Sequence, residues 1–411
     1  MKKVAIVGGG ISGLSIARLL KDKLLDVTVF EKEQTVGGLV RCRKIGDDLF
    51  HICGGHVFNS KRKDVMDWFW RIMPQTEFVK TDRNSAIMLA GDTMIPYPIE
   101  NHFYMLSHDM QMSIIQDLLS EDERQPFDNF DQFLRNAFGK TLYNLYFKPY
   151  NQKIWQQDLR SIPIAWLEGK LPVPDKAKIF FNNINHVEEK EFVHSSYWYN
   201  TVMGSQRIVD VLAQGVKIQY GCNVEKSVAR DGKWIINDNP FDEVVFCGNL
   251  KQLPSFVEGV DIASFEREID NLSYHGTTSV FCEIDANPFT WIYLPDESCQ
   301  CHRIICTNNL RFKSNAEART KAIVEFTNQV SLPEIMANLK KTPLHPSYID
   351  HVYNEYTYPV QSPASRSMIA SLRTKLASEG FYLLGRFAEW EYYNMDAAMG
   401  AAIDLSKMIA K

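Results

Sequence analysis

Residues 4–31 read VAIVGGGISGLSIARLLKDKLLDVTVFE and decide the fold. The pattern predicts a short strand, a G-x-G-x-x-G turn, an amphipathic helix and a second strand that ends on Glu31. The first glycine allows a tight turn, the second lets the backbone approach a pyrophosphate, and the third lets helix pack on strand. The helix N-terminus would hold the pyrophosphate, and Glu31 would accept hydrogen bonds from a ribose. The stretch therefore predicts a dinucleotide-binding unit, with a glycine-rich turn in another α/β unit as the alternative.

Composition limits the kind of protein this is. The chain has 411 residues, 45% of them hydrophobic, and a net charge of −5. This length predicts about two to three domains. Because the charges are mixed and no broad basic region occurs, nucleic acid is not an expected partner. No apolar run approaches the roughly 20 residues of a membrane span, and residues 4–7 are too few for a signal peptide. We expect a cytoplasmic protein without stable membrane insertion.

Four residues of types that can bind a metal ion lie close together in the sequence, near residue 300. They are Cys299, Cys301, His302 and Cys306. Residues 303–307 read as a strand, however, and a strand points alternate residues to opposite faces. In a chain with no export signal, cysteines are expected to be reduced thiols. We expect these cysteines to pack in the core and expect no metal site.

The order of predicted elements divides the chain into three parts. Strands and helices alternate in residues 1–62, return in 196–262 and close the chain in 376–411, so the nucleotide-binding domain is expected to be discontinuous. Residues 63–195 are mainly helical, with a short hairpin, and have the character of an insertion. Residues 263–375 carry strands that predict an antiparallel sheet.

Individual elements follow from shorter patterns. Apolar residues at helical spacing run from about 104 to 150, and Gly139 ends or bends the second helix there. A hairpin is predicted between strands 224–229 and 233–236, with its turn at Asp231-Gly232. Helices are predicted at 316–326 and 332–339. Further strands are predicted at 85–90, 93–97, 216–220, 243–247, 277–284, 290–294, 302–307 and 381–384, and further helices at 64–72, 207–213 and 396–410.

One histidine follows paired glycines, in HICGGHVFNS. Gly54 and Gly55 would leave the ring of His56 close to a ligand with little steric shielding. From the residues alone, a structural role is the commoner outcome and a ligand-facing role is the alternative.

Several stretches resemble the flavin-dependent UDP-galactopyranose mutases, most closely the eukaryotic branch. They lie between residues 8 and 396 and read GGGISGL, CGGHVFNSK, IPYPIENHF, YFKPYNQKIW, AWLEGKLPVP, TWIYLPDESCQCHRI, YTYPV and LLGRFAEWEYYNMD. All amine-oxidase-type flavoproteins share the dinucleotide motif, whereas PYPIEN, KPYNQKIW and GRFAEWEYYNMD are much more specific. The resemblance implies an α/β fold with a Rossmann-like FAD-binding domain, a helical domain and an antiparallel sheet, with the active cleft between them.

The resemblance also assigns a cofactor, FAD in its reduced form, and the residues around it. Those that would hold it are Gly8, Gly10, Ser12, Gly13, Glu31, Gly38, Leu39, Val224, Arg386, Asn394, Met395 and Asp396. Val224 would meet the adenine from its strand. His56 would lie against the flavin and tune its reactivity. The implied catalytic set is His56, Arg303, Arg386, Tyr358 and Tyr392.

The substrate residues follow from the same resemblance. Those implied are Tyr97, Glu100 and Asn101 for the uridine half, Trp155 and Trp291 beside the sugar, Tyr293, Tyr358 and Tyr392 for the diphosphate, and Arg303 and Lys170 as its two cations. Two positions depart from the family. Glu100 replaces the usual Gln and so offers only acceptors, and Lys170 replaces an arginine, which keeps the charge but loses the planar fork. Taken singly, each aromatic residue would be assigned to core packing.

The implied activity is a nucleotide-sugar mutase that interconverts the pyranose and furanose forms of UDP-galactose or a related UDP-sugar. In this family the reaction passes through a flavin N5–sugar adduct and serves lipopolysaccharide or other cell-surface polysaccharide synthesis. Its partners would be the UDP-sugar and a reductant for the flavin, and a homodimer is one state that the sequence leaves open. An FAD-dependent amine or protoporphyrinogen-type oxidase is the main alternative. A catalytically silent nucleotide-sugar-binding protein is a third.

Overall fold

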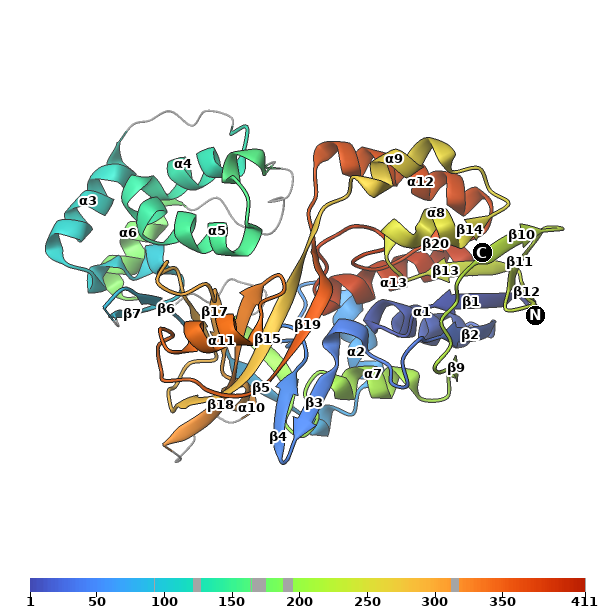
Figure 1. Ribbon diagram of the computed structural model, residues 1–411, viewed down its shortest axis with the longest axis horizontal. Coiled ribbons are helices and arrows are strands. Elements are labelled where there is room, and N and C mark those ends of the chain that lie inside the picture. The colour runs from blue at the N-terminus through green and yellow to red at the C-terminus, as the bar shows by residue number, and fades with distance from the viewer. Residues whose placement is uncertain are drawn as a thin grey trace.

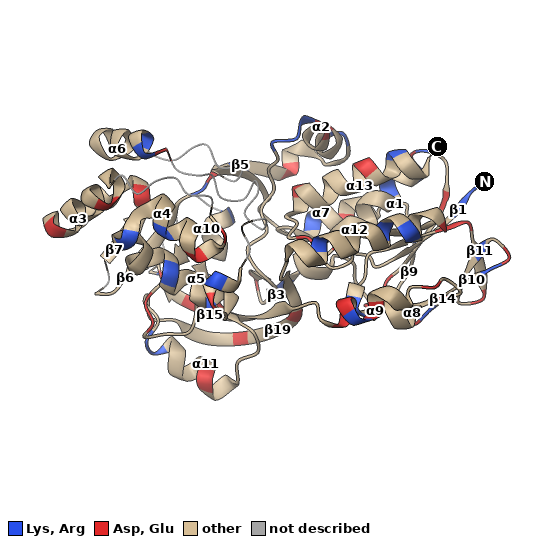
Figure 2. Cartoon of the chain, turned by 90° about the horizontal axis from the view of Figure 1, so that it is seen from above, with Lys and Arg blue, Asp and Glu red and all other residues tan. Residues whose placement is uncertain are grey.

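The computed structural model describes residues 1–91, 93–120, 127–162, 164, 175–187, 195–311 and 318–410. Its elements form three regions along the long axis of the molecule (Figure 1). A nucleotide-binding region carries both chain ends, two long strands cross the centre, and a group of helices lies at the opposite end. Basic and acidic side chains are interspersed over all three regions (Figure 2). Among the described residues, no helix combines the length and the apolar character that a membrane crossing requires.

The nucleotide-binding region is built on a five-stranded parallel sheet in the order β20-β13-β1-β2-β9. Its strands are β1 (Lys3–Val7), β2 (Asp26–Phe30), β9 (Lys217–Gln219), β13 (Glu243–Phe246) and β20 (Phe381–Leu383). Val4 and Ile6 pack against α1 (Ile11–Lys21) and α13 (Met395–Ile409), while Ala5 belongs to the cluster on the other face. Because both faces are covered, these strands are apolar without alternation. All five predicted strands are confirmed to within a residue.

A second, four-stranded sheet lies beside it in the order β12-β11-β10-β14. Its strands are β10 (Ser227–Arg230), β11 (Lys233–Ile236), β12 (Asn239–Phe241) and β14 (Val257–Glu258), and the helices near it are α8 (Leu253–Phe256), α9 (Ala263–Asp270) and α12 (Pro363–Ser378). The predicted hairpin is confirmed, but its first strand begins at Ser227. Val224 therefore precedes β10, which corrects its predicted place on the strand. Two residues before Val224, the backbone N–H of Cys222 donates to the carbonyl of Glu31 (2.9 Å).

The central sheet has seven strands in the order β19-β15-β18-β17-β16-β6-β7. They are β6 (Ser85–Leu89), β7 (Thr93–Pro96), β15 (Tyr274–Asp285), β16 (Trp291–Tyr293), β17 (Arg303–Ile305), β18 (Arg319–Thr327) and β19 (Ser347–Pro359). All neighbours pair antiparallel except β6 and β16, which are parallel. The predicted hairpin of the inserted part thus adds two strands to the sheet formed by residues 274–359.

The helix predicted at 316–326 is wrong, because residues 319–326 of this stretch belong to β18. Ala322, Ile323 and Val324 are fully buried, and the strand pairs with β15 on one side and β17 on the other. A central position in a sheet favours β-branched residues on both faces and overrides the helix propensity of Ala, Arg and Lys. Two long elements, β19 and α12, had no predicted counterpart.

The helical end of the molecule confirms the predicted helical segment. It comprises α3 (His108–Leu119), α4 (Phe130–Leu142), a π-helical turn (Tyr143–Phe147), α5 (Lys148–Trp155) and α6 (Lys176–Asn185). Gly139 breaks the regular path of α4 with φ +79°, as predicted for a bend. A Cβ there would lie 2.5 Å from the Cβ of Asp117, so only glycine fits. Asp117 then accepts from the backbone N–H of Thr141 (2.6 Å) and caps the helix where it resumes.

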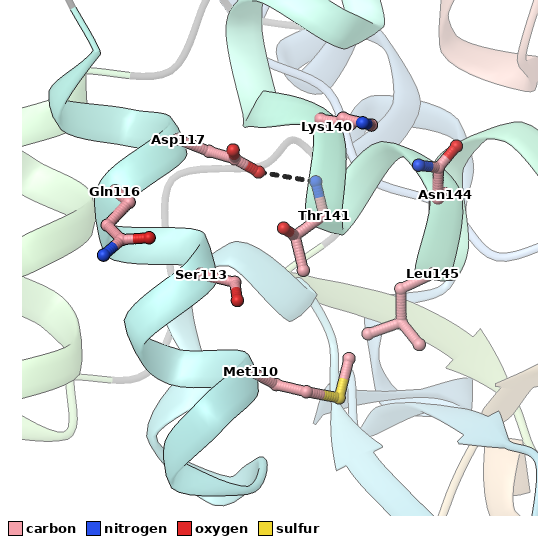
Figure 3. Close-up of a pocket in the computed structure, with 8 residues that line it drawn as sticks. All are labelled: Met110, Ser113, Gln116, Asp117, Lys140, Thr141, Asn144 and Leu145. Carbon is pink, nitrogen blue, oxygen red and sulfur yellow. Dashed lines mark hydrogen bonds between the residues drawn. The ribbon is translucent and has the colours of Figure 1, made fainter.

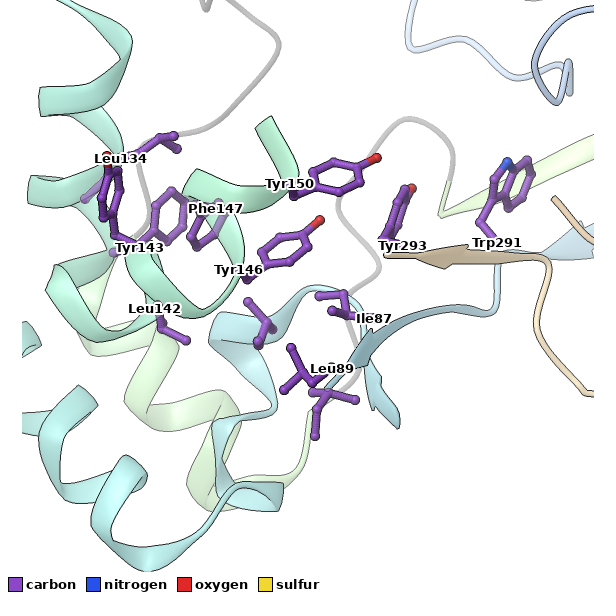
Figure 4. Close-up of a cluster of buried hydrophobic side chains, with 14 of the residues drawn as sticks. Ile87, Leu89, Leu134, Leu142, Tyr143, Tyr146, Phe147, Tyr150, Trp291 and Tyr293 are labelled. Carbon is purple, nitrogen blue, oxygen red and sulfur yellow. The ribbon is translucent and has the colours of Figure 1, made fainter. Parts of the chain in front are cut away.

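The remaining elements connect these regions. They are β3 (Cys42–Ile45) and β4 (Asp48–His51), α2 (Lys63–Ile72), β5 (Phe78–Asp82) and β8 (Ser196–Asn200), α7 (Gln206–Ala213), α10 (Thr307–Arg311) and α11 (Leu332–Leu339). One hydrophobic cluster joins the helices to the central sheet (Figure 4). It includes Tyr146 and Tyr150 from the helical end, and Trp291 and Tyr293 from β16. This shared core fixes the helical end against the sheet that carries Arg303.

Candidate functional site

The turn between β1 and α1 has the shape that a bound pyrophosphate requires. Gly8 has φ +109°, and a Cβ on Gly13 would lie 1.9 Å from the carbonyl oxygen of Gly8, so both positions require glycine. A Cβ on Gly10 would meet no atom within 4 Å, so the backbone there is open to a ligand. Gly10 caps α1 without a side-chain hydrogen bond, which leaves the first N–H groups of the helix for an anion. The residues of this turn fit a dinucleotide.

Glu31 lies at the end of β2, where the motif predicts it, and is only 6% exposed. One carboxylate oxygen accepts from the N–H of Gly9 (2.6 Å) and the other from the N–H of Glu33 (2.9 Å). The carboxylate thus fastens the glycine turn to β2. Since a carboxylate has about four lone-pair sites, it retains capacity for a ribose hydroxyl.

The structure brings the other predicted cofactor residues to this turn. A Cβ on Gly38 would lie 3.5 Å from the Cα of Gly10, and one on Gly385 would lie 2.8 Å from the Oγ of Ser12. Asn394 caps α13, whose first turn holds Met395 and Asp396, and α13 packs against α1. Leu39 hydrogen-bonds through its backbone to His56. Val224 belongs to a buried cluster that also contains Phe30, at the end of β2.

His56 lies where these cofactor residues meet the central sheet. Its Nε2 is buried and has no hydrogen-bond partner within the described part of the chain. A Cβ on Gly54 would lie 3.6 Å from this nitrogen and 3.8 Å from Nη2 of Arg303. The imidazole of His56 and the guanidinium of Arg303 therefore border the same space. Burial lowers the pKa of His56 well below its ordinary value, and the positive charges of Arg386 and Arg303 lower it further. The imidazole is therefore neutral at pH 7 and has a nitrogen available to a ligand.

Arg303 occupies β17 at the centre of the same space. Its Nε pairs with the carboxylate of Glu325, which is fully buried on β18, and its Nη2 donates to the hydroxyl of Tyr358 (3.1 Å). The other oxygen of Glu325 accepts from the N–H of Gly54 (2.8 Å). Burial opposes the charge, yet Glu325 and the nearby tyrosines raise the pKa of Arg303 well above its ordinary value. Arg303 is thus a permanent cation, held in place by a buried carboxylate.

Arg386 supplies a second cation on the cofactor side. Its guanidinium donates to the carbonyls of Thr357 (3.0 Å) and Tyr393, and lies 4.9 Å from the ring of Tyr392. Tyr392 stacks on Tyr358 with a centroid distance of 5.5 Å. Four of the five residues predicted to be catalytic are therefore connected through contacts, with Tyr358 joining Arg303 to Tyr392 and Arg386, while His56 and Arg303 both lie close to Gly54.

A second group of tyrosines lies around Tyr293. Tyr293 lies 5.1 Å from Tyr97 and 5.3 Å from Tyr150, measured between ring centroids. Figure 4 shows the hydroxyls of Tyr146 and Tyr150 pointing out of the helical core on the side where Tyr293 lies. Burial raises the pKa of Tyr150 well above its ordinary value, so its hydroxyl remains a hydrogen-bond donor.

The other predicted substrate residues are distributed around these tyrosines. Asn101 is buried, and the backbone carbonyl of Glu100 accepts from the side-chain amide of Asn183 (2.8 Å). Trp155 ends α5 and is 4% exposed. Trp291 borders Gly55, whose Cβ would lie 3.0 Å from the indole nitrogen. Lys170 lies outside the described residues.

Four residues of the site were missed from the sequence. Arg83 donates to the hydroxyl of Tyr293, and its guanidinium lies 4.6 Å from the ring of Trp291. Glu325 orients Arg303, and His51 accepts from the backbone N–H of His56 (3.3 Å). Tyr150 is part of the stretch KPYNQKIW, which carried the family resemblance, so a signal for it existed. Arg83 and Glu325 carry no comparable motif.

The cysteine-rich segment 299–306 provides no metal centre within the described part of the chain. The Sγ atoms of Cys299 and Cys301 are 3.4 Å apart, whereas Nε2 of His302 lies 3.7 Å from Glu325. The two thiols therefore lie beside each other, whereas the imidazole lies beside Glu325, so these side chains do not point to one common position.

A separate hollow of about 560 Å³ lies between α3 and the second half of α4 (Figure 3). Its lining includes Met110, Ser113, Asp117 and Lys140. The carboxylate of Asp117 is used to cap the helix at Thr141. The hollow belongs to the helical end and contains none of the predicted site residues, so we place the candidate site at Arg303 and His56.

The fold and the glycine turn define a dinucleotide-binding protein with a Rossmann-like domain. Residues 6–72 match the family model described as an NAD(P)-binding Rossmann-like domain. Within this class, the chain resembles the UDP-galactopyranose mutases along its whole length. It is 23% identical to the UDP-galactopyranose mutase of Mycoplasma genitalium over 430 aligned positions, which cover 99% of this chain and 94% of that protein.

Two further comparisons agree with this resemblance. The chain is 27% identical to the dTDP-fucopyranose mutase of Escherichia coli over 184 positions, 42% of this chain and 46% of that protein. A crystal structure of reduced UDP-galactopyranose mutase superposes with a TM-score of 0.87 at 18% identity, covering 100% of this chain and 94% of that one. The fold predicted from the resemblance is confirmed. Closeness to the eukaryotic branch stays a prediction.

Proposed function

We propose that this protein is a flavin-dependent nucleotide-sugar mutase that interconverts the pyranose and furanose forms of UDP-galactose or a closely related UDP-sugar. The observation that carries the proposal is the grouping of Arg303 with three tyrosines. Arg303 donates to the hydroxyl of Tyr358 and lies near Tyr150, whose ring is 5.3 Å from that of Tyr293. Such a group of donors suits a diphosphate. A full-length relative named UDP-galactopyranose mutase supports the same reading.

The residues around the glycine turn fit FAD. Gly10, Ser12 and Gly38 would hold the pyrophosphate, and His56 and Arg386 would lie at the flavin end. When bound and reduced, the flavin would supply an electron-rich nitrogen nucleophile for the anomeric carbon of the sugar. The neutral His56 would place its unpaired Nε2 beside that ring system without adding charge.

The chain's own task is to hold the sugar nucleotide and to stabilise the UDP that departs. Arg303 would hydrogen-bond the diphosphate, because its Nε is occupied by Glu325 while the rest of its guanidinium faces the tyrosine hydroxyls. Tyr358 and Tyr392 would donate to the same group. Trp155 and Trp291 would orient the sugar. This orientation would keep the anomeric carbon in one place while the ring changes size. Lys170, if it matches the second family arginine, would add a further cation.

The oxidase alternative requires the same cofactor residues but not this set of diphosphate partners. A flavin oxidase consumes oxygen in proportion to product, whereas a mutase leaves the oxidation level of the sugar unchanged. The deciding experiment incubates the dithionite-reduced protein with UDP-galactofuranose, UDP-galactopyranose and a small panel of other UDP-sugars, and separates the products by chromatography. Conversion between ring forms of one of these sugars supports the proposal. Oxygen uptake with an amine or porphyrinogen substrate, and no isomerisation, would favour the oxidase.

A further inference from the structure

The start of β15 contains an irregularity at one end of the proposed cleft. Its pairing with β19 shifts register between His275 and Thr277, where Gly276 alone lies opposite residues 355–357, so the extra residues of this β-bulge belong to β19. A bulge redirects the side chains around it and often occurs beside active sites. A Cβ on Gly276 would lie 2.4 Å from the hydroxyl of Tyr353, so any larger residue there would displace this ring.

The backbone at this bulge is fixed from two sides. The hydroxyl of Thr357 donates to the carbonyl of His275 (2.8 Å), and the carbonyl of Thr357 in turn accepts from Arg386 (3.0 Å). On the other side, the N–H of Gly276 donates to the side chain of Asn328 (3.1 Å). His275 is thus connected, through one residue, to a predicted catalytic arginine.

The neighbours of the imidazole are residues of the candidate site. His275 lies directly opposite Tyr358 on β19. Opposed residues of antiparallel strands lie on one face of the sheet, with Cβ atoms about 4.5–5.5 Å apart. Tyr358 accepts from Arg303, and the ring of Trp155 lies 6.5 Å from the imidazole at an interplanar angle of 69°. His275 therefore lies next to the residue that binds Arg303 and to the tryptophan predicted to flank the sugar.

One nitrogen of His275 is unused. Nε2 is shielded from solvent and has no hydrogen-bond partner among the described residues, while the side chain of Asn328 hydrogen-bonds the imidazole and so occupies Nδ1. Burial lowers the pKa of His275, which keeps the ring neutral at pH 7. A neutral imidazole nitrogen suits a hydroxyl, which can both donate and accept. Other buried polar atoms of the described residues also have no partner, but this one lies beside residues of the candidate site.

We propose that Nε2 of His275 hydrogen-bonds a hydroxyl of the sugar in the bound nucleotide sugar and so helps to determine which sugar is accepted. The proposal rests on the proposed function. Arg303 would serve the diphosphate, and Trp155 would offer an apolar face to the sugar ring. The hydroxyls of the sugar would still need a neutral hydrogen-bond partner, and His275 would supply one.

The test compares the binding of UDP, which has no sugar beyond the ribose, with that of UDP-galactose on the FAD-loaded protein. His275→Gln keeps an amide near the position of Nε2, and His275→Asn keeps one near the position of Nδ1. We expect His275→Asn to weaken UDP-galactose about five- to tenfold, the effect of one lost hydrogen bond, and to leave UDP unchanged. We expect His275→Gln to recover most of that loss. Flavin absorbance and the thermal midpoint control for folding.

Each of the other possible outcomes of this binding test would contradict either the inference or the proposed function. Recovery by His275→Asn but not by His275→Gln would assign the histidine to its contact with Asn328 and overturn the inference. Equal affinities of all variants for UDP-galactose would overturn it as well. If the wild-type protein binds neither UDP nor UDP-galactose, the proposed function itself fails, and the inference with it.

Discussion

At the scale of single residues, the ion pair between Arg303 and Glu325 determines the orientation and the charge of the guanidinium in the candidate site. Glu325 is fully buried, and the Arg303 side chain is 19% exposed. Removing one partner of such a pair leaves a buried charge without compensation. The pair therefore has two roles, to orient the guanidinium toward Tyr358 and to keep its charge in an apolar setting.

We predict that Arg303→Ala lowers the free energy of unfolding by about 3–5 kcal/mol, because Glu325 is left unpaired. The double variant Arg303→Ala/Glu325→Ala should lose less than the sum of the two single variants. Urea unfolding of the three variants measures this coupling. The exposed pair Asp158–Arg160 provides a control, since Arg160→Ala should change stability little. Additive losses at Arg303 and Glu325 would show that the pair is not buried as described.

His56 predicts a dependence of stability on pH. Because burial lowers its folded pKa, the unfolded chain binds a proton below about pH 6.5 that the folded chain does not. Its contribution to stability is therefore constant above this pH and declines as the pH falls. We predict that His56→Gln reduces the acid-side slope by about 1.4 kcal/mol per pH unit. Unfolding curves between pH 7 and pH 5 measure the slope. An unchanged slope would place the imidazole in water.

Sequence motifs predicted the site residues that lie in short, specific stretches and missed those set by packing. Tyr358, Tyr392 and Arg386 could be found because the chain segments around them read like family motifs. Arg83 could not, since only the folding of β6 beside β16 brings it to Tyr293. Glu325 lies in a stretch that the sequence predicted to be helical. Its pairing with Arg303 on the adjacent strand therefore could not be predicted.

At the scale of elements, the turn from β1 to α1 allows a test that separates folding from binding. Gly13 has no space for a Cβ, which would lie 1.9 Å from the carbonyl oxygen of Gly8, whereas a Cβ on Gly10 meets nothing within 4 Å. The two glycines are thus required for different reasons, Gly13 for the packing of helix on strand and Gly10 for a ligand.

We predict that Gly10→Ala folds with nearly unchanged stability but binds FAD at least tenfold more weakly, because the methyl group occupies the path of the pyrophosphate. Gly13→Ala should lower the thermal midpoint of the apoprotein as well. Flavin titration and thermal unfolding of both apoproteins measure the two effects. Full FAD affinity in Gly10→Ala would mean that the cofactor does not pass over this turn.

The elements themselves were predictable where local pattern and tertiary setting agree. The parallel strands, α1, α13 and the bend at Gly139 follow from glycine positions and apolar spacing. The prediction failed at β18, where a strand buried on both faces has the composition of a helix, and at β19, whose side chains are mostly half-buried and show no clear alternation. Both strands are specified by their partners in the central sheet.

At the scale of the whole molecule, the candidate site draws on distant parts of the chain. The glycine turn lies near residue 10, the tyrosines of the helical end near 150, Arg303 on the central sheet, and Arg386 just before the last helix. The site therefore exists only when all three regions are folded against one another. The proposal that the site binds a diphosphate rests on this convergence.

The most direct test of the account is anaerobic turnover of UDP-galactofuranose after a single addition of dithionite, counting product molecules per flavin. A mutase returns the sugar at its original oxidation level, so the reduced flavin is required but not consumed. We predict many turnovers per reduction, activity near zero with oxidised FAD, and no stoichiometric consumption of NADH or oxygen. One product or fewer per reduced flavin, or steady oxygen uptake during turnover, would contradict the account and favour an oxidase.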